Sequence, residues 1–411
     1  MRHLPALPIA LAPMEGVTNF PMRAWLHLAA APAALATPFL RVTATFPNAR
    51  GLPPGFVPEL VELPSGERPY AVVPQMMATE PDDFLRAADL FLTRGAPFVE
   101  LNAGCPSPTC VGKGAGSSLL QDPDDFHAFV RRLAAALGPE RVAVKMRTGF
   151  AGDDELPRLV SGLAPLPLAR VTVHGRTRPA GYKGLARWDL IEHTARLCRA
   201  PVYASGDVVD GASLAARLAQ APSVQGVLVG RGALRNPWVF QELRTGESVA
   251  LTPRALLAAI AAYALLHELH AERADELVRL VRAGLLAAPC GTAAAAWEQV
   301  YRTAAAALGV AAPDLAAGPL EGTLALSRHT MGRAKLLWNY LRSSLPTAFF
   351  APQLMRAADL GTLLAGIRRL AAPELEAPQP LRHEPGLDWL YSGSGRRAPE
   401  ASEPQTACVA W

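Results

Sequence analysis

The sequence predicts an α/β fold, a (β/α)8 TIM barrel followed by a C-terminal all-helical domain. Eight short apolar runs of the kind that form buried parallel strands alternate with Ala- and Leu-rich helical stretches over about 240 residues, as such a barrel requires. After Trp238 the strand pattern stops and only helical stretches follow. A doubly wound open sheet would show the same alternation, but no Gly-x-Gly-x-x-Gly motif follows the first run.

The strand-like runs are short, apolar and bounded by Gly, Pro or charged residues. They cover residues 7–12, 36–42, 70–75, 98–101, 142–145, 171–174, 202–204 and 227–229. Helical stretches lie between them, for example at 82–94, 123–137, 188–199 and 211–219. Because the carboxyl ends of all strands in such a barrel meet at one mouth, the residues that follow these runs are the candidates for a site.

Beyond the barrel the sequence predicts helices alone. They are expected at 253–271, 274–286, 292–308, 327–345 and 352–370. We therefore expect a catalytic barrel domain at 1–245 and a helical domain at 246–372 that includes an Ala-rich insertion at 246–322. Residues 373–411 are rich in Pro, Gly, Ser, Glu and Arg, which predicts a disordered tail.

The composition indicates a cytoplasmic protein without a metal site or a membrane segment. The formal net charge of +4 tolerates a polyanionic partner without requiring one. The five cysteines are widely spread and none has zinc spacing, so we expect neither disulfides nor bound metal. The longest apolar stretch, 255–266, is too short to span a bilayer. Prolines interrupt the first residues and Glu15 follows them, which favours a first strand over a signal peptide.

One cysteine follows a predicted strand directly. The apolar run at 98–101 leads into Asn102, Gly104, Cys105 and Pro106. Gly and Pro end the strand and leave a thiol at its carboxyl edge, where the chemistry of such barrels takes place. A cysteine there is a candidate general acid or nucleophile. Taken alone it would more often be a buried apolar residue, but its neighbours favour a catalytic role.

The other strand ends carry polar, cationic or Gly-rich segments. A lysine that ends a buried strand is costly unless something pairs with it. The Gly-rich turns after the last two strands lie where such barrels bind phosphate through backbone amides. The strand-end residues are Pro13, Met14 and Glu15 (first strand), Gln75 (third), Lys145 and Arg147 (fifth), His174 and Arg176 (sixth), Ser205, Gly206 and Asp207 (seventh), and Gly230 and Arg231 (eighth).

Together these residues predict an anionic, phosphorylated aromatic cofactor at the mouth. Amide donors, a cation, a carboxamide and an imidazole would surround one ligand, and FMN fits that set. In this arrangement the phosphate meets the last two turns, Lys145 lies beside the electron-rich pole of the ring system, and Gln75 lies at its edge.

The ordered motifs resemble those of the tRNA-dihydrouridine synthases. Over residues 9–240 they read APMEGV, LNAGCPSP, KMR, VHGRT, SGD and GRGALRNPW. A second portion, residues 327–342, is similar to the C-terminal helical domain of the C subfamily, which acts at position 16 of tRNA. The segments TPFLRV at 37–42 and LPSG at 63–66 point the same way.

The resemblance implies an FMN-dependent oxidoreductase that uses NADPH to reduce the C5=C6 bond of a uridine in the tRNA D-loop, at position 16. It implies that Cys105 is the general acid, that Asn102 holds the target base, and that Arg147 and Arg176 lie close to flavin or RNA. The FMN-binding residues would be Pro13, Met14, Glu15, Gln75, Lys145, His174, Ser205, Gly206, Asp207, Gly230 and Arg231.

Three features depart from the family pattern. Ser205 stands where the family usually carries Asn, and Ala115 interrupts a loop that usually carries adjacent glycines. Either change is expected to weaken flavin binding or loop closure. The extra residues at 246–322 affect the RNA-docking geometry but not the chemistry.

A basic helix face is the candidate tRNA surface. A uridine inside folded tRNA must be unstacked to enter a barrel mouth, which requires a separate surface that holds phosphates. Arg328, Lys335 and Arg342 recur every seven residues and therefore share one helix face, and Arg333 is expected to add charge nearby. An ordinary solvated face would show the same pattern. The expected partners are tRNA and NADPH, and we expect a monomer.

Two other functions remain open on the sequence. An FMN barrel oxidoreductase acting on a small substrate, such as a dihydroorotate dehydrogenase-like enzyme, would share the barrel and the cysteine but would not need a basic helical domain. A non-catalytic tRNA-binding protein would tolerate Ser205 and Ala115. Turnover of free orotate would favour the first, and failure to hold flavin would favour the second.

Overall fold

The computed structural model describes residues 7–47, 51–53, 55–341, 344–345, 351–371 and 379–380. Arg342, one of the candidate RNA-binding residues, lies outside the described residues, as does the predicted disordered tail apart from 379–380. None of the described helices is both long enough and apolar enough to cross a membrane.

The centre of the molecule is a closed barrel of parallel strands, which confirms the predicted (β/α)8 architecture. Its strands are β1 (Ile9–Leu11), β2 (Leu35–Ala36), β3 (Leu40–Arg41), β4 (Val72–Val73), β5 (Gln75–Met77), β6 (Val99–Ala103), β7 (Val142–Arg147), β8 (Val171–His174), β9 (Val202–Ser205) and β10 (Gly226–Val229). Pro38 lies between β2 and β3, and Pro74 lies between β4 and β5, so two of the barrel strands are split. A proline has no amide hydrogen to give to the ladder.

Strand pairing closes the ring. β1 pairs with β10 on one side and with β2 on the other, and β2 pairs with β4. The second halves of the split strands, β3 and β5, pair with each other, and β5 continues the ladder to β6. From β6 the order runs through β7, β8 and β9 to β10. All of these pairs are parallel, so every strand ends at the same mouth.

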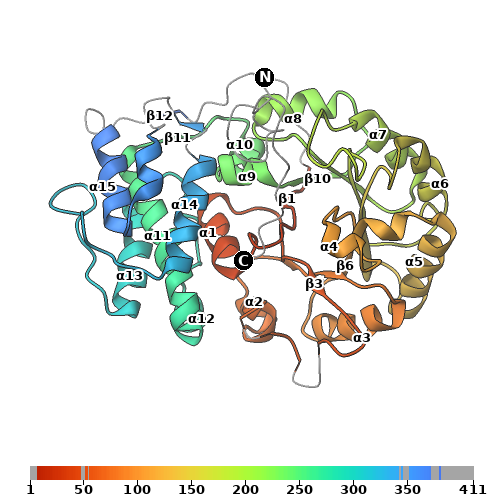
Figure 1. Ribbon diagram of the computed structural model, residues 1–411, viewed down its shortest axis with the longest axis horizontal. Helices are drawn as coiled ribbons and strands as arrows, with labels where there is room; N and C mark the ends of the chain where they lie inside the picture. Colours follow the sequence, from red (N-terminus) through yellow and green to blue (C-terminus); the bar gives the residue numbers. More distant parts are fainter. Residues whose placement is uncertain are drawn as a thin grey trace.

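Helices cover the outside of the barrel (Figure 1). Asp122 caps the longest of them, α5, by accepting the amide N–H groups of Asp124 and Asp125, and its apolar face is buried against the strands. The barrel helices are α1 (Phe20–Ala30), α2 (Pro58–Val61), α3 (Pro81–Leu92), α4 (Pro108–Val111), α5 (Pro123–Leu137), α6 (Leu156–Ser161), α7 (Trp188–Leu197), α8 (Gly211–Leu218), α9 (Arg231–Arg235) and α10 (Val239–Thr245). Short 3-10 turns complete them: η1 (Ser65–Glu67), η2 (Gly116–Leu120) and η3 (Asp153–Glu155).

A helical lobe follows the barrel and lies to one side of it (Figure 1). It consists of α11 (Pro253–Glu272), α12 (Ala274–Arg282), α13 (Ala294–Leu308), α14 (Arg328–Leu341), η6 (Pro352–Arg356) and α15 (Leu360–Ala371). The single helix predicted at 352–370 is therefore wrong, because the chain forms two separate helical segments there. The prediction of helices alone is also wrong, since β11 (Ala250–Leu251) pairs antiparallel with β12 (Gln379–Pro380) from the predicted tail.

An aromatic cluster joins the lobe to the barrel. Trp25 of α1 is fully buried and its indole N–H donates to the carbonyl of Ala259 in α11 at 2.8 Å. Its ring meets those of Trp238, Tyr263 and Trp297 at centroid distances of 6.2, 5.3 and 5.9 Å. Barrel and lobe thus share one hydrophobic core, which fixes the lobe beside the mouth.

Candidate active site

The strand register brings the predicted residues together at one mouth. Asn102 of β6 is paired with Lys145 of β7, Arg147 of β7 with His174 of β8, and His174 with Ser205 of β9. The third barrel strand continues past Gln75 to Met77, so the prediction that it ends at Gln75 is wrong. Gln75 instead points inward from the first residue of β5 and is fully buried.

A buried chain of hydrogen bonds crosses the floor of this mouth. The guanidinium of Arg170 donates to one carboxylate oxygen of Glu100 at 2.7 Å, and Gln75 Nε2 donates to the other at 2.8 Å. Asn102 Nδ2 in turn donates to Gln75 Oε1 at 2.9 Å. Glu100 was not predicted from the sequence. The only signal there is an acidic residue inside an otherwise apolar strand.

Asn102 connects this chain to the cysteine. Its side-chain oxygen accepts the amide N–H of Gly104 at 3.0 Å and that of Cys105 at 2.9 Å. The turn that carries Cys105 is therefore held by a side chain whose own orientation is set by Gln75. Because Asn102 Oδ1 accepts two bonds from the turn, Nδ2 is the end of the side chain that retains a donor for a ligand.

Cys105 is half-buried and packs against a small cluster that contains Cys110. Interaction with the Cys110 thiol, together with burial, raises the pKa of Cys105, while the same interaction lowers the pKa of Cys110. Cys105 is therefore a protonated thiol at neutral pH. Glu15, one of the predicted cofactor residues, is exposed and acts electrostatically on both thiols.

Cations converge on His174 at the mouth. Burial lowers the pKa of His174 well below its ordinary value, and the nearby Arg147, Lys145, Arg176 and Arg231 lower it further. Because Arg176 Nη1 lies 3.3 Å from His174 Nε2, that nitrogen accepts, and the neutral ring carries its proton on Nδ1. So much positive charge around a neutral imidazole favours an anionic ligand.

Arg147 and Arg176 are engaged with the protein itself. Arg147 donates to the carbonyl of Gly104 at 2.8 Å and to those of Thr177 and Gly181 at 2.8 and 2.9 Å. It thereby ties the cysteine turn to the loop that follows β8. Arg176 makes an ion pair with Asp207 at 2.7 Å, both side chains being almost fully buried.

Asp207 also organises the phosphate turn predicted after β9. Its second carboxylate oxygen accepts the amide N–H of Ala186 at 2.7 Å. Asp207 has φ +59 and Gly206 has φ +128, and a Cβ at Gly206 would lie 2.7 Å from the Cβ of Ala186. Glycine is therefore required at this turn.

Lys145 and Arg231 retain capacity for a ligand. Lys145 makes no hydrogen bond or ion pair with any described residue, and burial lowers its pKa to about 8 against the opposing effect of Glu100. Nη1 of Arg231 is buried without a partner in the part of the chain that the structure describes. Gly230 adjoins Met14, since a Cβ at Gly230 would lie 3.9 Å from its sulfur, so the first and last strand ends meet here.

An exposed tyrosine stands above these cations. Tyr182, in the loop after β8, is 47% exposed, and the guanidinium of Arg231 lies 4.3 Å from its ring centroid. Arg147 lies 5.7 Å from the same centroid. The sequence prediction missed Tyr182, although an aromatic residue flanked by Gly181 and Lys183 near a strand end is a usable signal.

The helical lobe reaches the mouth through α14. Arg333 of α14 donates to the carbonyl of Gly16, in the loop after β1. Arg333 is buried, so the expectation that it adds charge to the lobe surface is wrong. Arg328 is exposed and Lys335 half-buried, two helical turns apart on one face of α14.

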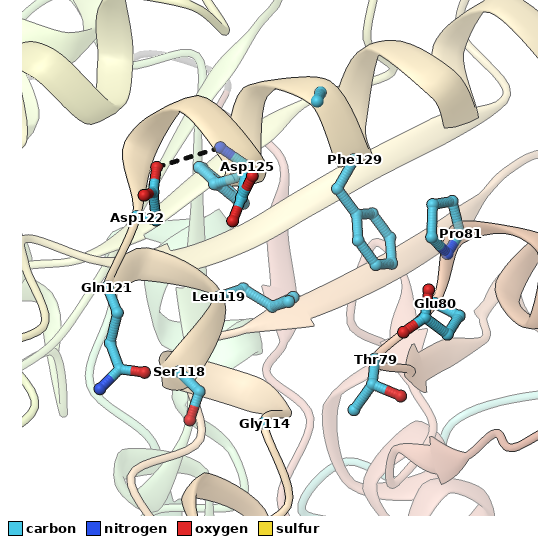
Figure 2. A pocket seen from close by; sticks show the side chains of 12 residues that line it. Thr79, Glu80, Pro81, Gly114, Ser118, Leu119, Gln121, Asp122, Asp125 and Phe129 are labelled. Atoms are coloured by element: carbon cyan, nitrogen blue, oxygen red, sulfur yellow. Dashed lines mark hydrogen bonds between the residues drawn. The ribbon is translucent and has the colours of Figure 1, made fainter.

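A separate cavity lies outside the barrel (Figure 2). It has a volume of about 480 Å³ and lies between the loop after β5, η2 and the start of α5. Glu80, Asp122 and Asp125 line it, and Asp122 accepts the amide N–H of Asp125 (Figure 2). Its acidic lining does not suit nucleic acid, and the predicted site residues are not part of it.

The fold and the mouth define a barrel protein that carries a thiol and a cluster of cations at its strand ends. Among the described residues no group of three or more His, Cys, Asp or Glu side chains could hold a metal ion. A family model described as dihydrouridine synthase matches residues 10–288. The chain belongs to the dihydrouridine synthase family.

Two relatives in this family are identical to the chain at about a third of the aligned positions. It is 32% identical over 251 residues to a tRNA-dihydrouridine(16) synthase of Aquipseudomonas alcaligenes, covering 59% of this chain and 77% of that protein. A tRNA-dihydrouridine(16) synthase of Ralstonia nicotianae is 33% identical over 243 residues, with coverage of 57% and 72%. Among solved structures, morphinone reductase is 14% identical with a TM-score of 0.43, covering 59% of this chain and 87% of that one.

Proposed function

We propose that the protein reduces the C5=C6 bond of a uridine in tRNA to 5,6-dihydrouridine. The observation that carries the proposal is the position of Cys105, a protonated thiol on a turn fixed by Asn102, facing a cationic mouth. Membership of the dihydrouridine synthase family supports the reaction, and the names of the relatives support tRNA as substrate and position 16 as the target.

FMN is the cofactor that the mouth fits. Buried Arg231 Nη1 has no partner among the described residues and Lys145 is unpaired there, so both could hold an anionic ligand. Reduced flavin, with NADPH as its reductant, would supply hydride to C6 of the uracil. The residues proposed to hold it are Pro13, Met14, Glu15, Gln75, Lys145, His174, Ser205, Gly206, Asp207, Gly230 and Arg231.

Cys105 would supply the proton for C5. The carbanion that develops at C5 after addition at C6 requires an acid on the other face of the ring, and a thiol that keeps its proton at neutral pH serves this purpose. Asn102, through Nδ2, would orient the uracil, and Tyr182 offers its exposed ring for stacking. Arg147 and Arg176 are proposed to position the loop that carries Tyr182.

The helical lobe at 246–372 is proposed to bind tRNA beside the catalytic barrel at 1–245. Arg328 and Lys335 would contact phosphates, with Arg342 as a third candidate on the same helix face. A monomer in the cytoplasm is the state we propose for the active enzyme.

Replacing Cys105 by Ala tests the proposed acid. Flavin reduction by NADPH should continue, while tRNA reduction should fall about 10²–10⁴-fold because the proton donor is missing. Stopped-flow flavin absorbance and dihydrouridine content of the tRNA measure the two steps separately. Cys198→Ala is the control and should retain both, and tRNA reduction at the parental rate by Cys105→Ala would exclude Cys105 as the acid.

The lowered pKa of Lys145 predicts a pH dependence of flavin binding. Above its pKa of about 8 the side chain is neutral, so FMN affinity should fall as the pH rises from about 7 to about 9. Lys145→Gln should bind FMN about tenfold more weakly at neutral pH, and its FMN affinity should no longer fall between about pH 7 and about pH 9. Fluorescence titration of FMN measures both. Lys113→Gln, on an exposed loop, should keep the wild-type dependence of FMN affinity on pH. The same pH dependence in Lys145→Gln would refute the assignment of Lys145 to the cofactor site.

Charge reversal on α14 tests the tRNA surface. Arg328→Glu combined with Lys335→Glu should raise the KM for tRNA. It should also reduce the slope of log affinity against log salt by about one for each phosphate that the variant no longer neutralises. The matched control, Arg131→Glu with Arg132→Glu on the outer face of α5, should change neither. A slope equal to the wild-type value in the α14 variant would remove this face from the docking surface.

A further inference from the structure

A second thiol lies beside the proposed proton donor. Cys110 belongs to α4, in the segment that follows Cys105, and is only 4% exposed. It forms a small apolar cluster with Met77 and Ala115, and Cys105 packs against this cluster. The two cysteine side chains are therefore neighbours in one packed cluster, and each thiol affects the pKa of the other.

The backbone fixes the two cysteines in this position. The amide of Ser117 donates to the carbonyl of Cys105, and that of Ala115 to the carbonyl of Cys110, both at 3.0 Å. Gly116 has φ +65, and a Cβ there would lie 2.9 Å from the Cys105 carbonyl oxygen and 3.1 Å from its Cβ. The segment 105–117 therefore folds back on itself and holds one thiol against the other.

The other described cysteines have no such neighbour. The pKa of Cys198 is raised to about 11 and that of Cys290 to about 12, in each case by burial alone. A thiol surrounded by apolar groups in this way is inert towards oxidants. Cys110 has a lowered pKa and lies beside the partly exposed Cys105, so one thiol of the pair can be oxidised and the other can resolve the product.

We propose that Cys105 and Cys110 form a reversible disulfide when the protein meets hydrogen peroxide, which makes the pair a redox modification site. Formation of the disulfide does not depend on the proposed function, and only its effect on activity rests on that function. A disulfide carries no proton, so the oxidised protein cannot protonate C5 of uracil. It also protects Cys105 from irreversible oxidation to a sulfinic acid.

The chemistry balances with peroxide as the oxidant. The pKa of Cys110 is lowered to about 7, so this is the sulfur that is deprotonated near neutral pH, and its thiolate attacks one peroxide oxygen, which forms a sulfenic acid and releases hydroxide as the O–O bond breaks. The thiol of Cys105 then attacks the sulfenic sulfur, forming the S–S bond and releasing water. The hydroxide takes up the proton first lost by Cys110. Two thiols and one peroxide give one disulfide and two waters, so sulfur is oxidised and the peroxide oxygens are reduced.

Thiol counting on the full chain tests the proposal directly. The protein is reduced with dithiothreitol, desalted, treated with hydrogen peroxide and denatured, after which free thiols are titrated and peptides are mapped by mass spectrometry. The wild type should lose two thiols, yield a peptide in which Cys105 and Cys110 are linked, and regain both thiols with dithiothreitol. Cys198→Ala is the matched control and should behave in the same way.

Replacing Cys110 distinguishes its role as the disulfide partner from a general sensitivity of Cys105 to peroxide. Cys110→Ala should form no such disulfide, and peroxide should oxidise its Cys105 to a form that dithiothreitol does not restore. Cys110→Ser, which keeps the size of the side chain, should do the same and serves if the Ala variant does not fold. Wild-type protein that keeps both thiols free, or in which each is oxidised separately, would overturn the proposal.

A parallel activity assay distinguishes failure of this proposal from failure of the proposed function. If the reduced protein modifies tRNA, peroxide should abolish that activity in the wild type in step with disulfide formation, and dithiothreitol should restore it. If the reduced protein does not modify tRNA, the proposed function fails while the thiol count still decides the disulfide. Disulfide formation with unchanged tRNA reduction would instead refute the assignment of Cys105 as the acid.

Discussion

One buried carboxylate holds the turn that carries Cys105 in place. Glu100 is fully inaccessible and accepts hydrogen bonds from Arg170 on one oxygen and from Gln75 on the other. Removal of one partner from a buried ion pair of this kind destabilises a protein by about 3–5 kcal/mol. Arg170 and Glu100 therefore each depend on the charge of the other. The chain of hydrogen bonds continues through Asn102 to the amide of Cys105, so the position of the thiol depends on a route that begins at the residue before β8.

The cationic side chains at the mouth fall into two groups, those that bind the protein itself and those with donors free for a ligand. Arg147 and Arg176 donate to loop carbonyls and to Asp207, and thus fix the loop that presents Tyr182. Lys145 and Arg231 keep donors free among the described residues. Because Arg147 and Arg176 already fix the surrounding loop, the mouth can bind an anion without rearranging.

The sequence predicted the barrel well, and the strand-end residues that it singled out meet at one mouth, because a parallel barrel brings all strand ends together whatever the details of each strand. Prediction from the sequence failed where contacts between residues far apart in the chain determine the local structure. Glu100 is acceptable in an apolar strand only because Arg170 and Gln75 meet it, and β11 exists only because Gln379–Pro380 returns to pair with it. Ala- and Leu-rich composition favours helix throughout 352–370, so the break between η6 and α15 was not foreseeable from periodicity.

The central claim is that one mouth brings a flavin, a reductant and a tRNA uridine together. An anaerobic absorbance trace of the purified protein tests it, with NADPH added first and unmodified tRNA second. The account predicts a flavin spectrum that bleaches with NADPH and returns when the tRNA is added. A colourless protein that does not take up FMN would contradict it.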